Sequence, residues 1–369
     1  MSGWDVIIVG GGPGGSTAAW RLARAGKKVL VLDAAKFPRV KLCAGWVTKN
    51  VLADLELNPA AYPHTIQPFE AVYVSCGGPL RETRWREPAS YGIIRKEFDA
   101  FLLRRAEAAG AVVREGVRVK SAWEAGDGVR VEADEIYEAR AVIGAGGHTC
   151  PVARALGGVS DEEAVVLTQE SETLVGEDIL RRVAPHYGLP ELFAEPDFKG
   201  YAWYFTKGGF LNIGVGCIGK NPSVHKRLEA LMALLEESGR VPRGVPLAPF
   251  RGHAYSIRRR AVRRAAGRRF LLVGDAAGLA RDFSGEGIGP AVRSAALAAD
   301  TLVKWLEGGS ALEDYAARIE TLYGSGERGV GTWLAGFLPE GVVRAVAKRI
   351  CGNAWLRRKV VLEGAFGIG

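Results

Sequence analysis

A glycine-rich turn near the start of the chain constrains the fold more than any other feature of the sequence. The apolar run DVIIVG (Asp5–Gly10) predicts a buried parallel strand, and GSTAAWRLARAG (Gly15–Gly26) predicts a helix that ends at a glycine. KVLVLD (Lys28–Asp33) predicts the next strand. The three segments together predict a βαβ unit, which is typical of the α/β class.

The glycines of this unit have the spacing of a dinucleotide-binding turn, G-x-G-x-x-G. Gly10 permits the tight turn, Gly12 lets the backbone approach a pyrophosphate, and Gly15 lets helix and strand pack closely. Free N–H groups and the helix dipole then hold the anion, and Gly14 belongs to the same predicted cofactor site. Asp33, at the end of the second strand, is placed to accept hydrogen bonds from ribose hydroxyls.

A second glycine-rich turn follows another apolar strand near the other end of the chain, in LLVGDAAGLARDFSGEGIG. Two anion cradles from opposite ends of one chain fit a long ligand such as FAD. We expect Gly274 and Asp275 near the ribityl chain and pyrophosphate. The N–H groups of Gly287 and Ile288, with Gly285 in the same loop, are expected at the flavin pyrimidine, where negative charge develops on reduction.

Between the two turns the sequence pattern changes. Residues 161–264 contain antiparallel-looking strands, such as AVVLTQES and FLNIGVGCIG, and one helix. The first domain is therefore predicted to be discontinuous, with a second domain inserted into it. The predicted divisions are an FAD-binding domain of residues 1–65, 92–160 and 265–308, a substrate domain of residues 66–91 and 161–264, and a helical C-terminal region of residues 309–369.

Several segments resemble a known fold group. GGGPGG, the predicted helix RKEFDAFLLRRA, and GDAAG with FSGEGIG are similar to segments of the FAD-dependent para-hydroxybenzoate hydroxylase fold group, and within it of the geranylgeranyl reductase family. The K-x-C-x-G segment of that family reads KLCAG here, from Lys41 to Gly45. Its Y-x-W-x-F-P signature reads YAWYFT from Tyr201 to Thr206, followed by Gly214 and Gly216. The resemblance covers residues 1 to about 305 and leaves the C-terminal tail outside it.

This resemblance implies a fold and an activity. The fold is α/β, with a discontinuous Rossmann-like FAD-binding domain of the para-hydroxybenzoate hydroxylase type, an inserted antiparallel-sheet substrate domain and a helical C-terminal tail. The activity is flavin-dependent reduction of C=C bonds in a polyprenyl chain on a lipid, quinone or tetrapyrrole. An isolated alkene lacks an electron-withdrawing group, so hydride delivery needs a proton donor at the other carbon and a dry, apolar pocket.

The resemblance also implies individual contacts. It places Lys41, Cys43 and Ala44 beside the flavin, with the Cys43 thiol as a candidate catalytic contact or proton donor. Arg95 is implied as a cofactor contact, and Val119, on a strand after that helix, as a backbone contact to adenine. The implied substrate wall consists of Tyr201, Trp203 and Phe205, and Trp46 is predicted to contact the substrate as well.

Each of these residues also has a structural interpretation. A lone cysteine is commonly a small buried apolar residue. An arginine that opens a helix near Glu97 commonly forms a surface ion pair, and an aromatic strand face is commonly plain core.

The sequence departs from the family pattern at informative positions. Trp46 stands where glycine is usual, which predicts a pocket closed for a different substrate from the usual long lipid. Gly146-Gly147 replaces an Asp-Gly pair that contacts FAD and pyridine nucleotide in the wider fold group. NAD(P)H and a reduced electron carrier, such as an electron-donor protein, therefore remain alternative reductants.

Basic residues gather in two parts of the 369-residue chain, whose net charge is +8. Residues 241–270 hold nine arginines and no acid, and residues 341–369 hold six basic residues against one acid. A solvated basic face is the simpler interpretation, and contact with an anionic membrane surface is the functional alternative. Few aromatic residues interleave the arginines, so no nucleic-acid partner is predicted.

The start of the chain leaves no room for a signal segment, and no apolar run reaches eighteen residues. These features predict a cytoplasmic protein, and contact with lipid would make it a peripheral membrane protein.

Cysteine and histidine spacing suggests neither a disulfide framework nor a metal site. The five cysteines form no C-x-x-C pair, and the five histidines share no ligand spacing and are interpreted as structural or surface residues.

Three other functions fit parts of the pattern. A flavin monooxygenase or halogenase shares the fold, although the W-x-W-x-I-P segment of halogenases is not found. A quinone or other electron-transfer flavoprotein would use the same cofactor site without an alkene product. A lipid-binding or nucleic-acid-binding module would not depend on a flavin.

Overall fold

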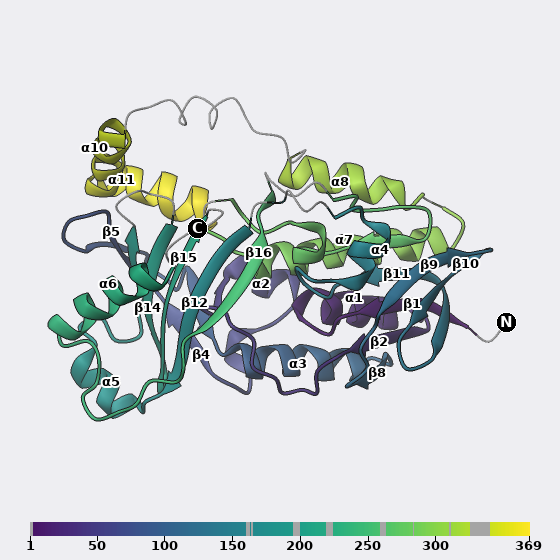
Figure 1. The fold of residues 1–369 in the computed structure, drawn as a ribbon, viewed down its shortest axis with the longest axis horizontal. Helices are drawn as coiled ribbons and strands as arrows, with labels where there is room; N and C mark the ends of the chain where they lie inside the picture. Colours follow the sequence, from purple (N-terminus) through teal and green to yellow (C-terminus); the bar gives the residue numbers. More distant parts are fainter. Residues whose placement is uncertain are drawn as a thin grey trace.

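The computed structural model describes residues 3–159, 163, 165–194, 200–218, 224–258, 263–282, 284–309, 311–324 and 340–369 (Figure 1). Three sheets, which we call A, B and C, organise these residues, in the mixed α/β arrangement that the sequence predicts.

Sheet A contains the predicted βαβ unit, in the order β8-β2-β1-β11-β10-β9, with β17 also paired to β11. Its strands are β1 (Trp4–Val9), β2 (Val29–Asp33), β8 (Val112–Glu115), β9 (Ser121–Ala125), β10 (Gly128–Glu132), β11 (Ile136–Gly144) and β17 (Phe270–Leu272). β8, β2, β1, β11 and β17 run parallel to one another, whereas β10 is antiparallel to both β11 and β9. The pairing of β17 with β11 returns a distant segment to the same sheet, so the predicted discontinuous FAD-binding fold is confirmed.

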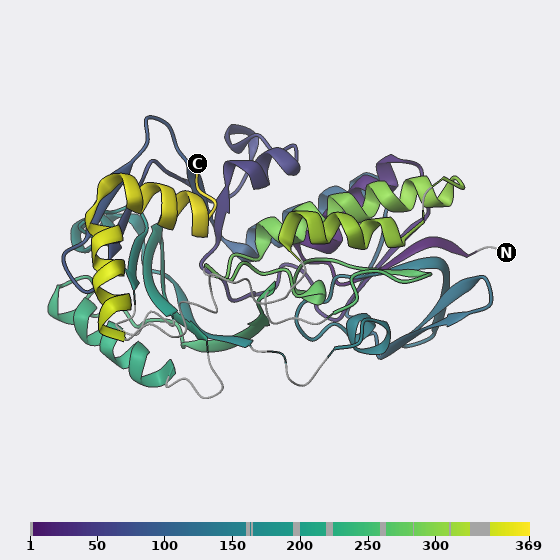
Figure 2. The same cartoon turned by 90° about the horizontal axis from the view of Figure 1, so that it is seen from above.

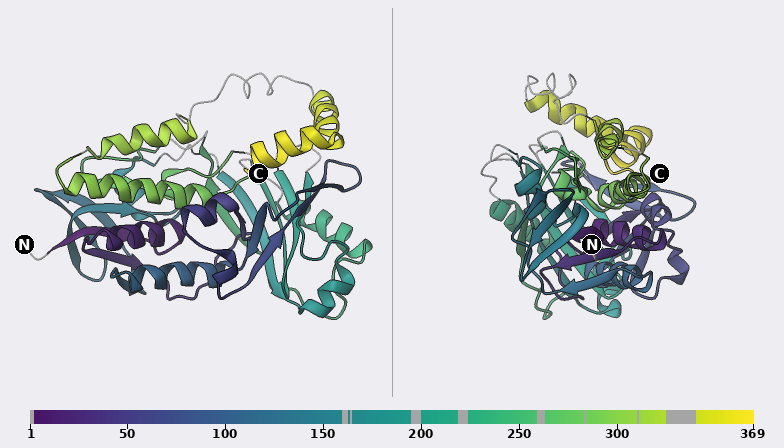
Figure 3. Two further views of the ribbon diagram at one scale, coloured as in Figure 1. Left: turned by 180° about the vertical axis from the view of Figure 1, so that it is seen from behind. Right: turned by 90° about the vertical axis from the view of Figure 1, so that its right-hand side faces the viewer.

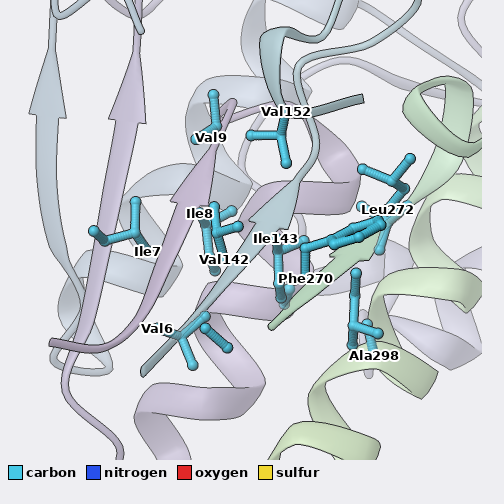
Figure 4. Packing of buried hydrophobic residues seen from close by; sticks show 14 of the residues in the cluster. Val6, Ile7, Ile8, Val9, Val142, Ile143, Val152, Phe270, Leu272 and Ala298 are labelled. Atoms are coloured by element: carbon cyan, nitrogen blue, oxygen red, sulfur yellow. The ribbon is translucent and has the colours of Figure 1, made fainter. Parts of the chain in front are cut away.

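Helices cover sheet A and seal its core. α1 (Pro13–Arg24) packs between α3 (Arg95–Ala108) and α7 (Ile288–Leu306). Figure 4 shows Ile8, Ile143 and Phe270 above Ala298 of α7, and all four side chains are buried in one apolar cluster. Burial of apolar side chains along β1 is what a parallel strand covered on both faces requires.

Sheet C is the predicted antiparallel sheet, in the order β16-β12-β15-β14-β13-β5-β6. Its strands are β5 (Ala71–Ser75), β6 (Arg81–Arg84), β12 (Val165–Leu174), β13 (Glu191–Ala194), β14 (Gly200–Lys207), β15 (Phe210–Ile218) and β16 (Arg251–Ser256). Only the described pair β13–β5 is parallel. α5 (Glu177–Val183) and α6 (Val224–Glu237) cover one face through an apolar cluster that includes Tyr204, Leu211 and Leu235, which leaves the other face for the centre of the molecule (Figure 2).

Sheet B is small and joins the two larger sheets. It has the order β3-β7-β4, with β3 (Trp46–Thr48), β4 (Ile66–Phe69) and β7 (Ser90–Ile93), and lies beside α2 (Lys49–Asp54) and the short turn η1 (Pro59–Ala61). Hydrogen bonds in this sheet connect segments on both sides of the predicted domain divisions at residues 65 and 91, so those divisions stay predictions.

The C-terminal region is helical, as predicted. α8 (Glu313–Tyr323) packs on α7, and Tyr315 donates a hydrogen bond to the Leu272 carbonyl oxygen at 2.7 Å. α10 (Glu340–Gly352), α11 (Ala354–Leu356) and the π-helical η4 (Arg357–Ala365) lie over sheet C, as Figures 2 and 3 show. Among the described helices, none combines the length and apolar character needed to cross a bilayer.

A disulfide between Cys76 and Cys351 corrects the interpretation of the cysteines. The two residues are 275 positions apart, with their Cα atoms 6.2 Å from each other, and they join the β5–β6 connection to the end of α10. Sequence spacing could not indicate this bond, because only the packing of the C-terminal region on sheet C brings the two thiols together. Cys43, Cys150 and Cys217 are not in disulfides.

We predict that the disulfide stabilises the folded protein through one shared interaction. Cys76→Ser and Cys351→Ser are each expected to lower the free energy of unfolding by about 2–4 kcal/mol, because each restores the freedom of the unfolded chain. The double variant is expected to lose no more than either single variant, since the bond is already absent. Urea unfolding measures all three, and alkylation of all five cysteines in denaturant without reductant would contradict the bond.

Candidate active site

One cavity of about 1610 Å³ lies where sheets A, B and C meet. The glycine turn after β1 lies at one part of its wall, the Lys41–Trp46 segment and Arg95 at another, and β12, β14 and β16 of sheet C opposite. The loop before α7 and the C-terminal segment α10–η4 complete the lining. Segments far apart in the sequence therefore share one chamber.

The turn after β1 has no room for side chains. Gly10 has φ +109°, and an added Cβ would collide with the carbonyl oxygen of Ala145. A Cβ on Gly15 would collide with the Gly10 carbonyl oxygen, because α1 packs so closely on β1. Gly12 is the N-cap of α1 without a side-chain cap, and Gly12 and Gly14 line the cavity. The uncapped N–H groups of α1 thus face a space that can take an anion.

Asp33 lies beside this turn and lines the cavity. Its Oδ2 accepts a hydrogen bond from the Gly11 N–H at 2.6 Å, and its Oδ1 accepts one from the Ala35 N–H at 2.8 Å. These bonds fix the carboxylate at the end of β2, where a ribose hydroxyl could reach it. Val119 is buried in the connection between β8 and β9, so its predicted place on a strand is wrong, and it does not line the cavity.

The second turn presents another helix N-terminus to the same cavity. α7 starts after Gly287, and Gly287, Ile288 and Asp275 line the cavity. In the first turn of α7 the Gly289 N–H donates to Glu286 Oε1 at 2.5 Å. Gly274 and Gly285 have φ +57° and +64°. Two helix starts that open on one chamber fit a long dinucleotide such as FAD.

Two arginines predicted to lie on a basic surface are instead buried near this turn. Arg263 Nη1 donates to the backbone carbonyl oxygens of Asp275 and Ala276, each at 3.0 Å, and its Nη2 lies 2.6 Å from Glu163 Oε2. Arg258 donates to the Gly324 carbonyl oxygen. At these two positions the arginine-rich run therefore supports the fold. Residues 259–262 of the run lie outside the described residues.

Arg95 is held by a carboxylate one helical turn away. Its Nε and Nη2 donate to Asp99 Oδ1 and Oδ2, both at 2.7 Å, and Arg39 Nη1 lies 3.2 Å from the same carboxylate. Arg95 is 6% exposed and lines the cavity, so the alternative of a surface pair with Glu97 is wrong. Glu97 instead accepts a hydrogen bond from the Thr65 N–H.

Lys41 and His253 form a polar pair in the cavity wall. Lys41 Nζ lies 2.7 Å from His253 Nε2. Burial, together with the charge of Lys41, lowers the pKa of His253 to about 3, and burial and the charge of Arg95 lower the pKa of Lys41. The neutral imidazole of His253 therefore accepts a hydrogen bond from the Lys41 ammonium group. The sequence did not predict a site role for His253, because a single histidine with no partner at a recognisable spacing does not indicate a functional site.

A buried lysine joins the Lys41–Trp46 segment to sheet C. Lys207 is fully buried, and its Nζ donates to the Ala44 carbonyl oxygen at 2.9 Å and the Ile93 carbonyl oxygen at 3.0 Å. Its charge is balanced by Glu172, with Nζ and Oε1 2.6 Å apart. Gly45, at φ +66°, leaves room for this contact, because a Cβ there would come within 2.8 Å of Nζ.

Cross-strand register arranges the sheet C face of the cavity in rows. Glu170 of β12 lies opposite Gly214 of β15, which lies opposite Trp203 of β14. The next row contains Glu172, Asn212 and Phe205. Trp203 Nε1 donates to Asn212 Oδ1 at 2.6 Å, and Asn212 Nδ2 donates to Glu172 Oε1 at 3.2 Å. Polar bonds thus fix an aromatic wall.

Aromatic rings from three segments close this end of the cavity. The Trp46 ring centroid lies 5.2 Å from that of Phe205 and 5.4 Å from that of Phe366 in the C-terminal segment. Tyr201 also packs on Phe366, at 5.4 Å, and donates a hydrogen bond to the Ser284 carbonyl oxygen. Edge-to-face and tilted contacts of this kind hold the rings in fixed positions. The apolar surface that the rings form favours apolar ligands.

Comparison with known proteins places this arrangement in a family. Residues 3–320 match the family described as FAD binding domain. A menaquinone reductase of Mycolicibacterium smegmatis is 31% identical over 341 residues, which cover 86% of this chain and 80% of the relative. A digeranylgeranylglycerophospholipid reductase of Methanopyrus kandleri is 30% identical over 319 residues, 82% of this chain and 81% of the relative.

The chain belongs to the geranylgeranyl reductase family of FAD-dependent oxidoreductases. FAD is therefore the cofactor of this reductase. A geranylgeranyl bacteriochlorophyll reductase-like protein from Thermoplasma acidophilum has the same fold, with a TM-score of 0.79 and 21% identity over 99% of this chain and 97% of that chain. That match extends the similarity into the C-terminal region, which the sequence motifs left outside it.

The structure gathers almost all of the predicted site residues of the reductase around one cavity. Gly15 and Val119 are the two that do not line it. The lining residues are Gly10, Gly12, Gly14, Asp33, Lys41, Cys43, Ala44, Trp46, Arg95, Tyr201, Trp203, Phe205, Gly274, Asp275, Gly285, Gly287 and Ile288. Which of them contact FAD or substrate stays a prediction.

We predict that Gly214 is needed for the position of the indole. A Cβ at this position would collide with Trp203 and come within 2.8 Å of the Glu170 Cβ. Gly214→Ala is expected to cost about 1–3 kcal/mol of stability, as overpacking does, and to shift the tryptophan fluorescence. Gly78→Ala, at an exposed position with open space around the added Cβ, is the matched control. Equal effects of the two substitutions would contradict the packing argument.

Proposed function

We propose that this reductase adds hydrogen across isolated C=C bonds of a polyprenyl chain. The observation that carries the proposal is the continuity of one cavity from the two helix N-termini to an apolar end. That end is lined by Trp46, Leu192, Trp203, Phe205, Ile350 and Phe366. A prenyl chain carries no polar groups, so an apolar wall along its length favours its binding. The names of the relatives, which include reductases of geranylgeranyl groups and of menaquinone, support the same class of substrate.

The residues of this chain have separable tasks in the proposed reaction. The two glycine turns, Asp33 and Asp275 would hold FAD, which supplies hydride from N5 once reduced. The aromatic wall would orient the chain and exclude water from the reacting carbons. The C-terminal segment would cover the chain, since Ala347 and Val361 also line the cavity. Cys43 lines the cavity as well and would contact the flavin or the substrate.

We predict that anaerobic, dithionite-reduced protein adds mass to a geranylgeranyl lipid or a prenylquinone in steps of two hydrogens. Purified protein is expected to be yellow with bound FAD. Lipid mass spectrometry and the flavin absorbance check both results. Unchanged lipid mass with rapid flavin reoxidation by quinone would favour an electron-transfer flavoprotein, and oxygenated or halogenated product would favour the other rival activities. Comparison of NADPH with a reduced carrier protein in place of dithionite would identify the class of reductant.

We propose further that the C-terminal segment rests on an anionic membrane surface. Val342, Val346 and Trp355 are 45%, 50% and 65% exposed on α10 and α11. Arg344, Lys348 and Arg349 are exposed on α10 beside them. Exposed apolar and basic side chains on one short helix fit a lipid interface. Because other residues of α10 line the cavity, such contact would bring its entrance to the lipid.

We predict that Trp355→Ala lowers binding to vesicles that contain phosphatidylglycerol by about tenfold, from the lost burial of one large side chain. Trp123→Ala is the matched control, because Trp123 is 36% exposed on β9, far from the C-terminal segment (Figure 1). Co-sedimentation with these vesicles and with phosphatidylcholine alone measures the effect. Equal binding of both variants, or equal binding to the two vesicle types, would contradict the proposed surface.

A further inference from the structure

A carboxyl group lies in the cavity wall between the Lys41–Trp46 segment and the aromatic strand. Glu170 is 3% exposed on β12 and lines the cavity. Gly214 lies beside it in the sheet, and Trp203 lies beyond Gly214. The Cys43 backbone lies close to the Glu170 carboxyl group. Glu170 is therefore at the point where the predicted flavin side and the predicted prenyl side of the cavity meet.

Two carboxyl groups on the same strand face have different surroundings. Glu172 lies two residues after Glu170, so both point to the same face of sheet C. Glu172 has an ammonium partner, since its Oε1 lies 2.6 Å from Lys207 Nζ, and it accepts a further bond from Asn212. Among the described ion pairs, Glu170 has no comparable cation. Glu172 thus has a direct ammonium partner, whereas Glu170 is buried without one among the described ion pairs, and burial favours the protonated acid.

We propose that Glu170 is the proton donor to the alkene, an inference that rests on the proposed prenyl reduction. The hydride, with its electron pair, forms a C–H bond at one alkene carbon. The π electron pair forms the second C–H bond with the proton of Glu170, whose O–H bond breaks to leave a carboxylate. The alkene is reduced, the flavin is oxidised, and the carboxylate then takes a proton from water.

The protonation of Glu170 supports this role. Burial, together with the charge of Glu172, raises the pKa of Glu170 from 4.5 to about 7, although Lys207 and Lys41 act in the opposite direction. Near neutral pH a large fraction of the group is therefore protonated and can both give and regain a proton. The titratable side chains that face it from the surrounding elements are Lys41, Cys43, Glu172, Tyr201, Lys207 and Tyr255.

Other acids near the site are less suited to the task. The Tyr201 hydroxyl already donates a hydrogen bond to the Ser284 carbonyl oxygen at 2.5 Å. Lys207 donates to two backbone carbonyl oxygens and to Glu172. His253 lies against the Lys41 ammonium, and its lowered pKa keeps it unprotonated near neutral pH.

An infrared experiment tests the protonation state without turnover. FAD-loaded wild-type protein, Glu170→Gln and the exposed control Glu138→Gln are titrated from pH 5 to 9. We expect the wild type and the control to share a carboxylic acid C=O band that titrates near pH 7 and that Glu170→Gln lacks. Glu286, another buried carboxyl group with a raised pKa, contributes equally to all three proteins and cancels in the difference spectra. An unchanged band in Glu170→Gln would overturn the proposal.

A kinetic experiment tests the transfer itself. Dithionite-reduced protein is mixed with a geranylgeranyl lipid under anaerobic conditions, and flavin reoxidation is followed together with lipid mass. Glu170→Gln is expected to retain FAD and to reoxidise at least 100-fold more slowly, within the usual contribution of a positioned acid. The wild-type rate is expected to fall tenfold for each pH unit above about 7, because the protonated acid is the active form.

Chemical rescue separates proton donation from a structural role. Acetic acid is expected to restore the rate of Glu170→Ala at least tenfold but to leave Glu170→Gln unchanged, because only the alanine variant has space for a free acid. Turnover of Glu170→Gln within threefold of wild type would overturn the donor role while leaving prenyl reduction intact. Absence of lipid reduction by the wild type would overturn the proposed function instead, and with it the donor role.

Discussion

A buried ammonium group holds the two sides of the cavity together. Lys207 Nζ, at the end of β14, bonds to backbone oxygens of the Lys41–Trp46 segment and of β7, and to Glu172 on β12. Burial of an ammonium group away from water costs several kcal/mol unless all of its N–H donors are hydrogen-bonded. Here three acceptors surround Lys207 Nζ. The segment predicted to lie beside the flavin is thereby fixed relative to sheet C. Hydride transfer in the proposed reaction would depend on such a fixed distance.

Sheets A and C contribute to the cavity in different ways, the first through backbone groups and the second through side chains. The two helix starts beside sheet A offer backbone N–H groups, which could hold a cofactor in the same way whatever the substrate. Sheet C offers side chains in cross-strand rows, so its cavity face depends on residue choice at alternate positions. The C-terminal segment adds a third surface, with Phe366 against Trp46 and Tyr201. The large residue at Trp46 is part of a ring cluster, which gives a packing reason for its presence.

Sequence reasoning reached the fold and the cofactor because their signals are local. The spacing of Gly10, Gly12 and Gly15 reflects steric limits within one turn, and β1 and α1 follow from apolar periodicity. Lys207 bonds to Ala44 and Ile93, and His253 to Lys41, each more than 100 positions away, as is the disulfide partner of Cys76. No local pattern distinguishes a buried lysine from a surface one. The misplaced strand at Val119 is a boundary error of a few residues, since β9 begins at Ser121.

The β14–β15 hairpin has a consequence for how relatives of this protein can differ. Gly208 and Gly209 form its two-residue connection, with Lys207 paired to Phe210. One added residue in β14 or β15 would turn the cavity face of that strand outward, because side chains alternate. Trp203 would then no longer pack against Gly214, and Lys207 would no longer pair with Glu172. The predicted substrate face of this sheet can therefore change by exchange of residues but not by change of strand length, and the C-terminal segment over it is held in place by the Cys76–Cys351 disulfide.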